Sequence, residues 1–206
     1  MKKIDQRFVK KVVEIAKGAG LIVMQIYNKP FKFKRKKDSS PVTKADLLSE
    51  EFISSALKKL ATNIPIIAEE SFSSKKLPKK LRKTFWLVDP LDGTKEFISK
   101  NGQFTINIAL IKNGKPILGV IHAPAKKSTF FGLVEKKQAY RSSNDNFKKI
   151  NTRHPENLNP IFALSRSHGK GKKLENFLSK IKKYKKIEIG SSLKFCIVAS
   201  GQADLY

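Results

Sequence analysis

The sequence has little cysteine and no long apolar run. Its single cysteine, Cys196, cannot form a disulfide within the chain, which favours a reducing compartment. No stretch of about 18 consecutive apolar residues occurs, and the N-terminus lacks the apolar core of a signal peptide, so we expect no transmembrane segment. These absences predict a cytoplasmic protein. Peripheral contact with the cytoplasmic face of the inner membrane stays open as an alternative.

Acidic residues are also scarce. The chain has 17 acidic against 43 basic residues, a formal net charge of +26. Such a charge suits a nucleic-acid-binding protein, which we keep as an alternative. However, only six of the basic residues are arginine, the residue that makes bidentate contacts to bases, and the lysines are spread along the chain. We therefore expect no dedicated nucleic-acid site, but a positive field that attracts polyanionic small molecules.

Apolar periodicity predicts the helices. Residues 5–28 and 44–60 carry apolar side chains at three- and four-residue steps. The buried positions expected in the first helix are Phe8, Val12, Ile15, Ala19, Ile22 and Ile26. Those expected in the second are Leu47, Leu48, Phe52, Ala56, Leu57 and Leu60. Two further helices are expected near residues 172–182 and 192–200.

Short alternating or apolar runs predict the strands. They lie at residues 31–36, 64–68, 85–88, 104–111, 116–122, 129–134, 139–142, 161–165 and 185–189. Asn113-Gly114 is a strong turn dipeptide and predicts a hairpin there. The polar stretch 143–159 is a plausible boundary, so we expect a first domain over residues 1–157 and a second over 158–206.

The most informative segment is Asp89-Pro90-Leu91-Asp92-Gly93-Thr94, which follows a buried strand. The turn can direct both carboxylates and the Leu91 carbonyl to one point, where hard oxygen ligands suit Mg²⁺. The Gly93 and Thr94 amides, at the start of a helix, suit a phosphate.

The same residues are also ordinary turn chemistry. Two further carboxylates favour the metal site: Glu69, which ends the preceding strand, and Asp46, which follows Val42-Thr43-Lys44-Ala45.

These motifs resemble those of the inositol monophosphatase superfamily, and specifically its CysQ-type 3′(2′),5′-bisphosphate nucleotidases. The resemblance extends to residues 85–111, to Ser165-Arg166-Ser167-His168 and to residues 190–196. It implies a layered αβαβα sandwich of helices and mostly antiparallel sheets, and Mg²⁺-dependent hydrolysis of adenosine 3′,5′-bisphosphate to AMP and phosphate, with the sulfated analogue as a related substrate.

The resemblance also assigns roles to residues. Glu69, Asp89 and the Leu91 carbonyl would hold one Mg²⁺, and Asp89 and Asp92 would share a second. Thr94, hydrogen-bonded to Asp46, would orient and help deprotonate the attacking water with Glu69 assisting. The residues implied to contact substrate are Glu69, Leu91, Asp92, Gly93, Thr94, His168, Ser191 and Lys194. Plain alternatives stay open for the last three: a loop residue, a helix cap and a solvated lysine.

Members of that family continue past the point where this sequence ends, with an arginine and then a Trp-Asp motif that completes the second metal site. We therefore expect an incomplete second domain, a weakened second metal ion and impaired activity. Two alternatives follow, a non-catalytic remnant that binds nucleotide and one half of a split enzyme that pairs with a complementing chain or a homodimer partner. Inositol monophosphatase activity is a less favoured reading.

Overall fold

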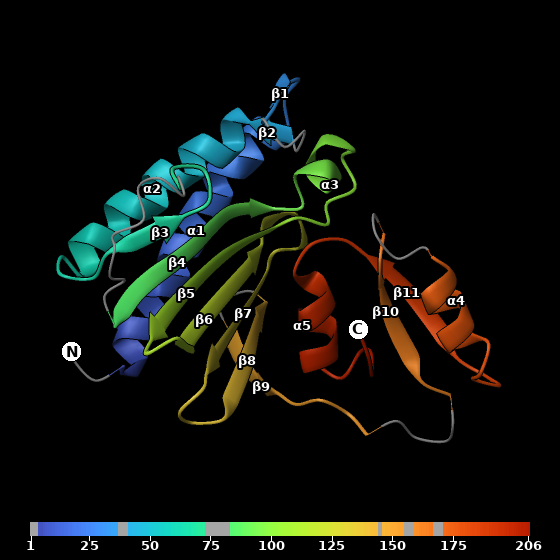
Figure 1. Cartoon of the computed structure of the whole chain (residues 1–206). Coiled ribbons are helices and arrows are strands. Elements are labelled where there is room, and N and C mark those ends of the chain that lie inside the picture. Colours follow the sequence, from blue (N-terminus) through green and yellow to red (C-terminus); the bar gives the residue numbers. More distant parts are fainter. Residues whose placement is uncertain (1–3, 37–40, 73–82, 144–145, 155–158, 167–170) are drawn as a thin grey trace.

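The computed structural model describes residues 4–36, 41–72, 83–143, 146–154, 159–166 and 171–206. The described residues form five layers (Figure 1): the helices α1 and α2, a large sheet, the helix α5, a small sheet and the helix α4. The layered α/β sandwich expected from the sequence is confirmed.

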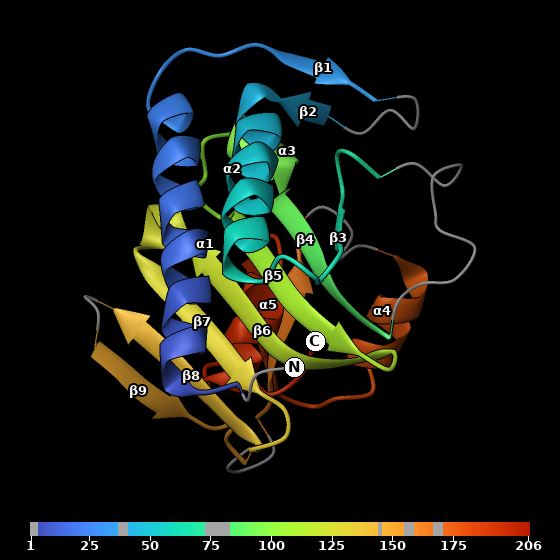
Figure 2. The same ribbon diagram turned by 90° about the vertical axis from the view of Figure 1, so that its left-hand side faces the viewer.

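The first layer consists of two long helices that lie side by side across one face of the large sheet (Figure 2). They are α1 (Gln6–Tyr27) and α2 (Lys44–Leu60). Asp5 caps α1, since its carboxylate accepts a 2.7 Å hydrogen bond from the Phe8 amide. Between these helices and the sheet lies the main apolar core, which includes the fully buried Trp86. Burial of this apolar surface is the principal stabilisation of the layer.

Among the described residues, the large sheet has seven strands in the order β3-β4-β5-β6-β7-β8-β9. All neighbours are antiparallel except β3 and β4, which run parallel. The strands are β3 (Ile66–Ala68), β4 (Thr84–Asp92), β5 (Thr105–Lys112), β6 (Lys115–Ala123), β7 (Ser128–Leu133), β8 (Gln138–Ser143) and β9 (Asn146–Ile150). The short helix η2 (Pro124–Lys126) joins β6 to β7.

The hairpin between β5 and β6 turns at Asn113-Gly114, as the sequence predicted. Both residues have positive φ, 52° and 74°. Two successive positive φ angles match the twist of the flanking strands, and asparagine and glycine adopt them at the lowest cost.

Beside the helices lies a two-stranded antiparallel ribbon of β1 (Phe33–Arg35) and β2 (Pro41–Thr43). The first strand was expected, but the second was not. The sequence pattern placed a polar loop up to Pro41, and three residues are too few to show a strand periodicity.

The buried faces of both long helices differ from those predicted. In α1 the fully buried side chains are those of Val9, Val12, Val13, Ala16, Ala19 and Val23, so that Phe8, Ile15, Ile22 and Ile26 lie at the margins of the face. In α2, Leu47 is 55% and Phe52 37% exposed, while Asp46, Ser49 and Glu50 are buried with Ile53 and Leu57. The prediction for α2 was wrong because it assumed that only apolar side chains face inward.

The last segments form the small sheet and its helices. β10 (Ile161–Ser165) and β11 (Lys185–Ile189) run parallel, with α4 (Lys172–Leu178) between them in sequence and α5 (Leu193–Ala199) after them. Leu205 makes a parallel bridge to Phe162 of β10. Cys196 lies in the interior, and burial raises the pKa of its thiol to about 12.

The expected domain boundary at residues 157–158 lies outside the described residues and stays a prediction. The polar stretch that precedes it contains β9, which pairs with β8 at the edge of the large sheet. Among the described residues, no helix has the length and apolar character needed to cross a membrane.

Candidate active site

A strand-to-helix turn at the end of β4 brings two aspartates to one edge of the large sheet. Asp89 lies opposite Asn107 of β5 and Asp92 opposite Thr105, with a shift of register between the two pairs. This irregularity lets both carboxylates emerge from one short turn. Gly93 follows with φ 90°, a conformation that glycine adopts without steric cost, and α3 (Thr94–Ile98) begins directly after it. The strand, turn and helix expected from the sequence are all present.

Glu69 reaches the same edge from the neighbouring strand. Because β3 runs parallel to β4, with Ala68 beside Val88, both strands end at this edge. The Glu69 amide donates a 3.1 Å hydrogen bond to the Val88 carbonyl oxygen of β4. Glu69 therefore directly precedes the point where the main chain after β3 separates from β4. The structure thus brings Glu69 close to Asp89, as the sequence predicted.

The carboxylates at this edge repel one another. Burial, the Asp92 carboxylate and the Glu69 carboxylate raise the pKa of Asp89 to about 8. Burial also raises the pKa of Asp92, although the Ser192 amide and the Lys194 ammonium offset part of the effect. A cation placed here would stabilise the charged carboxylates. The donors are all oxygen, so their chemistry fits Mg²⁺.

Lys36, which follows β1, supplies a positive charge beside this site. Its Nζ donates hydrogen bonds to Glu69 Oε1 at 2.9 Å and to Glu70 Oε1 at 2.6 Å. Burial alone would lower the pKa of Lys36, but its hydrogen bonds to the two glutamates raise it above its ordinary value. Among the described residues no three acidic, histidine or cysteine side chains stand together as a closed set of metal ligands.

Thr94 and Asp46 form the hydrogen bond that the resemblance implied. Thr94 Oγ1 lies 3.3 Å from Asp46 Oδ1 and 3.3 Å from the Leu91 carbonyl oxygen. The other oxygen of Asp46 accepts bonds from the amide and hydroxyl of Thr43, 2.7 and 2.6 Å, which also caps α2. Burial nevertheless raises the pKa of Asp46. Asp46 therefore has a fixed orientation and a raised affinity for a proton.

The connection between β11 and α5 closes the site from the second sheet. The Ser192 amide donates a 2.5 Å hydrogen bond to Asp92 Oδ2, and Ser192 Oγ donates to Asn107 Oδ1 at 2.9 Å. Gly190 sits so close to Glu96 that an added Cβ would lie 2.4 Å from Glu96 Cγ. This packing holds the second sheet against the aspartate turn, at the end of the molecule where Figure 1 shows α3.

Lys194 is not the solvated lysine of the alternative reading, because it is only 8% exposed. Its Nζ donates a 2.5 Å hydrogen bond to the Ser191 carbonyl oxygen and lies 5.2 Å from the centre of the Tyr206 ring. Ser191 itself is buried and has φ 54°; its hydroxyl accepts a long 3.4 Å bond from the Leu193 amide.

A cavity of about 490 Å³ joins these groups. Its lining includes Glu69, Asp92, Gly93, Thr94, Ser191 and Lys194, with Phe195 and Tyr206 on the wall beside Lys194. The sequence had placed all of the first six at the site. Asp46, Asp89 and Leu91 are not among the lining residues, and His168 lies outside the described residues.

Sequence reasoning missed several residues of this region. They are Lys36, Ser49, Glu50, Gln103 and Asn107, each of which bonds a segment that carries a predicted site residue. Ser49 and Glu50 had a readable signal, since they lie three and four residues after Asp46 and hence on the same face of α2. Lys36, Gln103 and Asn107 approach from other elements, and no local pattern reveals their contacts.

Comparison with known proteins agrees with this geometry. A family model described as "Inositol monophosphatase family" matches residues 5–206 of this chain. The protein of Salmonella typhimurium named 3′(2′),5′-bisphosphate nucleotidase CysQ is 42% identical, and the match covers 96% of this chain and 79% of that protein. The protein of the same name in Buchnera aphidicola is 40% identical, and the match covers 98% of this chain and 76% of that protein. The crystal structure of CysQ from Bacteroides thetaiotaomicron superposes with a TM-score of 0.79 at 33% identity, over 97% of this chain and 79% of that one. The chain belongs to the inositol monophosphatase family.

Proposed function

We propose that this protein is a Mg²⁺-dependent phosphomonoesterase that hydrolyses adenosine 3′,5′-bisphosphate to AMP and phosphate. The observation that carries the proposal is the meeting of Glu69, Asp89 and Asp92 at one edge, where repulsion and burial raise the pKa of Asp89 to about 8. The choice of substrate is supported by the similarity to proteins named 3′(2′),5′-bisphosphate nucleotidase.

Mg²⁺ would be held by the carboxylates of Glu69, Asp89 and Asp92 together with the Leu91 carbonyl oxygen. Glu69, Asp89 and the Leu91 carbonyl would hold one ion, and Asp89 and Asp92 would contribute to holding a second. When bound, Mg²⁺ supplies positive charge that lowers the pKa of water and neutralises the phosphate oxygens. The protein contributes the fixed ligands and a partly enclosed cavity.

Thr94 and Asp46 are the groups that we assign to the attacking water. Since the Thr94 hydroxyl donates to Asp46, its oxygen can accept a hydrogen bond from water. The raised pKa of Asp46 makes its carboxylate a better proton acceptor than an exposed aspartate. Glu69, which lines the same cavity as Thr94, would assist in orienting that water.

The water oxygen then forms a bond to phosphorus while the ester bond between phosphorus and the 3′ oxygen breaks. The leaving oxygen takes a proton, and the products are AMP and inorganic phosphate. We assign the Gly93 and Thr94 amides to the reacting phosphate. Lys194 has further N–H donors beyond its bond to Ser191 and is assigned, with Ser191, to the second phosphate. The role of His168 stays a prediction.

The test is phosphate release from adenosine 3′,5′-bisphosphate by the purified chain, with and without Mg²⁺. Asp89→Asn removes a charged ligand but keeps the shape of the side chain. We expect release only with Mg²⁺, and a loss of activity on the order of 10²–10³-fold or more in the variant. Inositol 1-phosphate serves as the comparison substrate.

Equal release by the wild type and Asp89→Asn would contradict the proposed site. Faster release from inositol 1-phosphate than from the nucleotide would contradict the proposed substrate. Tight nucleotide binding without any release would favour the non-catalytic alternative.

A further inference from the structure

The inward face of α2 is polar where it meets the active site. Asp46, Ser49 and Glu50 are 1%, 0% and 7% exposed, although they lie on the helix that covers the apolar core. A polar side chain is costly to bury unless it finds hydrogen-bond partners. Each of these three side chains has a partner in a segment that carries the site.

Glu50 makes the most specific of these contacts. Its Oε2 accepts a 2.7 Å hydrogen bond from the Glu70 amide, and its Oε1 accepts a 2.8 Å hydrogen bond from the Ser71 amide. The two amides directly follow Glu69, whose own amide makes a bond to β4. Glu50 therefore holds the main chain at the point where β3 leaves the sheet. Hydrogen bonds to a charged acceptor are stronger than those between neutral groups.

The neighbouring side chains of α2 hold the other half of the site. Ser49 Oγ donates a 2.9 Å hydrogen bond to the Pro90 carbonyl oxygen, inside the aspartate turn, and Asp46 accepts from Thr94. One rigid helix thus fixes the end of β3, the turn after β4 and the first residue of α3. The distance between Glu69 and the two aspartates depends on this common attachment.

We propose that Glu50 is a positioning residue for the metal site. It fixes the backbone that carries Glu69 and Glu70, so that the Glu69 carboxylate stands at the right distance from Asp89 for both to bind one Mg²⁺. The inference rests on the proposed function, because it assumes that these two carboxylates are metal ligands. Glu50 itself touches neither metal nor substrate.

The test is Glu50→Gln, with Mg²⁺ binding measured by isothermal titration calorimetry on the folded protein. Glutamine has the same shape, but its NH₂ group opposes one of the two amide donors instead of accepting from it. Removing a residue that orients metal ligands costs about 10–100-fold in metal affinity, and we expect a loss in that range. At saturating Mg²⁺, kcat should fall more than the KM for nucleotide changes, because the groups assigned to the two phosphates, at residues 93–94, 191 and 194, lie on other segments.

The matched control is Glu51→Gln, which removes the same charge from the adjacent, exposed position of α2. Its Mg²⁺ affinity should stay within about twofold of wild type, because an exposed charge is largely screened. Glu50→Asp keeps the carboxylate but shortens its reach, and should recover part of the affinity. If Glu50→Gln does not fold, Glu50→Asp tests the proposal in its place. A folded Glu50→Asp variant with wild-type Mg²⁺ affinity would overturn the role of Glu50.

The measurements distinguish a failure of the proposed function from a failure of the proposed role of Glu50. If wild type binds no Mg²⁺, or binds it as well as Asp89→Asn does, the proposed function fails and this inference fails with it. If wild type binds Mg²⁺ and Asp89→Asn does not, but Glu50→Gln behaves like Glu51→Gln, the metal site stands and only the role of Glu50 is refuted.

Discussion

His122 is a buried histidine near the end of β6, opposite Ile106 of β5. Its Nδ1 lies 2.9 Å from Thr129 Oγ1, and its ring packs against Gly20 of α1, where an added Cβ would lie 2.6 Å from the imidazole. Burial and, second, the Lys17 ammonium lower the pKa of His122 to about 4 from its ordinary 6.5. The folded protein therefore keeps this imidazole neutral at a pH where the unfolded chain would protonate it.

The consequence is a loss of stability in acid. Above pH 6.5 His122 is neutral in both states, and the free energy of unfolding does not depend on it. Between pH 6.5 and 4 only the unfolded state takes up a proton, so stability falls, by about 3 kcal/mol in total, and below pH 4 the loss levels off. We expect His122→Gln to remove this component, measured as the difference in urea unfolding free energy between pH 7 and pH 5.

The control for this measurement is internal, since every other titrating group is shared by the wild type and the variant. A lower free energy of unfolding for His122→Gln at both pH values is compatible with the prediction, because the position is tightly packed. The interpretation is wrong if the two proteins lose the same free energy between pH 7 and pH 5.

Residues of the site differ in how far the sequence revealed them. Asp89, Asp92 and Thr94 are adjacent in the chain, so one local turn motif identified them and the structure places them together. Glu69 was chosen because it ends the preceding predicted strand, and the structure shows that this strand runs parallel to β4 and ends at the same edge. Lys36 comes from a separate ribbon, and its bonds to Glu69 and Glu70 depend on three-dimensional packing. A contact of that kind has no trace in local sequence.

Among the elements, α2 shows where a periodic pattern misleads. Its bounds were predicted correctly, because length, the Thr43 cap and the apolar content are local properties. Its orientation was wrong, because the pattern counted Leu47 and Phe52 as interior, whereas the helix turns Ser49 and Glu50 inward. At these positions Ser49 and Glu50 are buried with hydrogen-bond partners, whereas Leu47 and Phe52 stay exposed. Polar residues at helical spacing can therefore mark a functional face.

This orientation predicts a contrast between two aliphatic residues of α2. Leu47 is 55% exposed and Ile53 is fully buried. We expect Leu47→Ala to change the free energy of unfolding by no more than about 0.5 kcal/mol. Ile53→Ala should cost about 2–5 kcal/mol through lost burial and the cavity it leaves. Chemical denaturation of both variants checks this; equal losses would contradict the orientation of the helix.

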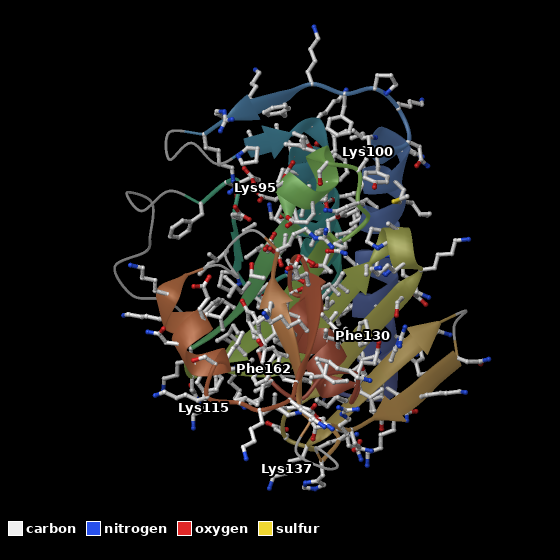
Figure 3. The ribbon with its side chains drawn as sticks, turned by 90° about the vertical axis from the view of Figure 1, so that its right-hand side faces the viewer. Lys95, Lys100, Lys115, Phe130, Lys137 and Phe162 are labelled. Atoms are coloured by element: carbon white, nitrogen blue, oxygen red, sulfur yellow. The ribbon has the colours of Figure 1, made fainter. Side chains whose placement is uncertain are left out.

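The whole molecule combines a familiar layered fold with an unusual charge. The layer order followed from the family resemblance, while β9 and the second ribbon strand β2 were too short or too polar to read from the pattern. Among the described residues, lysines lie at both ends of the molecule. Figure 3 shows Lys95 and Lys100 at the α3 end of the molecule and Lys115 and Lys137 at the opposite end. Such a distribution gives a general positive field rather than a nucleic-acid groove.

A general positive field should speed the arrival of an anionic substrate. With a net charge of +26 on the chain, we expect kcat/KM for adenosine 3′,5′-bisphosphate to fall on the order of tenfold as KCl rises from about 0.02 to about 0.2 M at fixed Mg²⁺. Screening acts on the encounter, so kcat should change little. The inhibition constant of AMP, which carries one phosphate fewer, should respond less steeply to the same salt series. If kcat/KM stays constant, or if both ligands respond equally, the charge of this protein has no part in capturing its substrate, and the lysine-rich composition would remain a property of the chain without a role in the reaction.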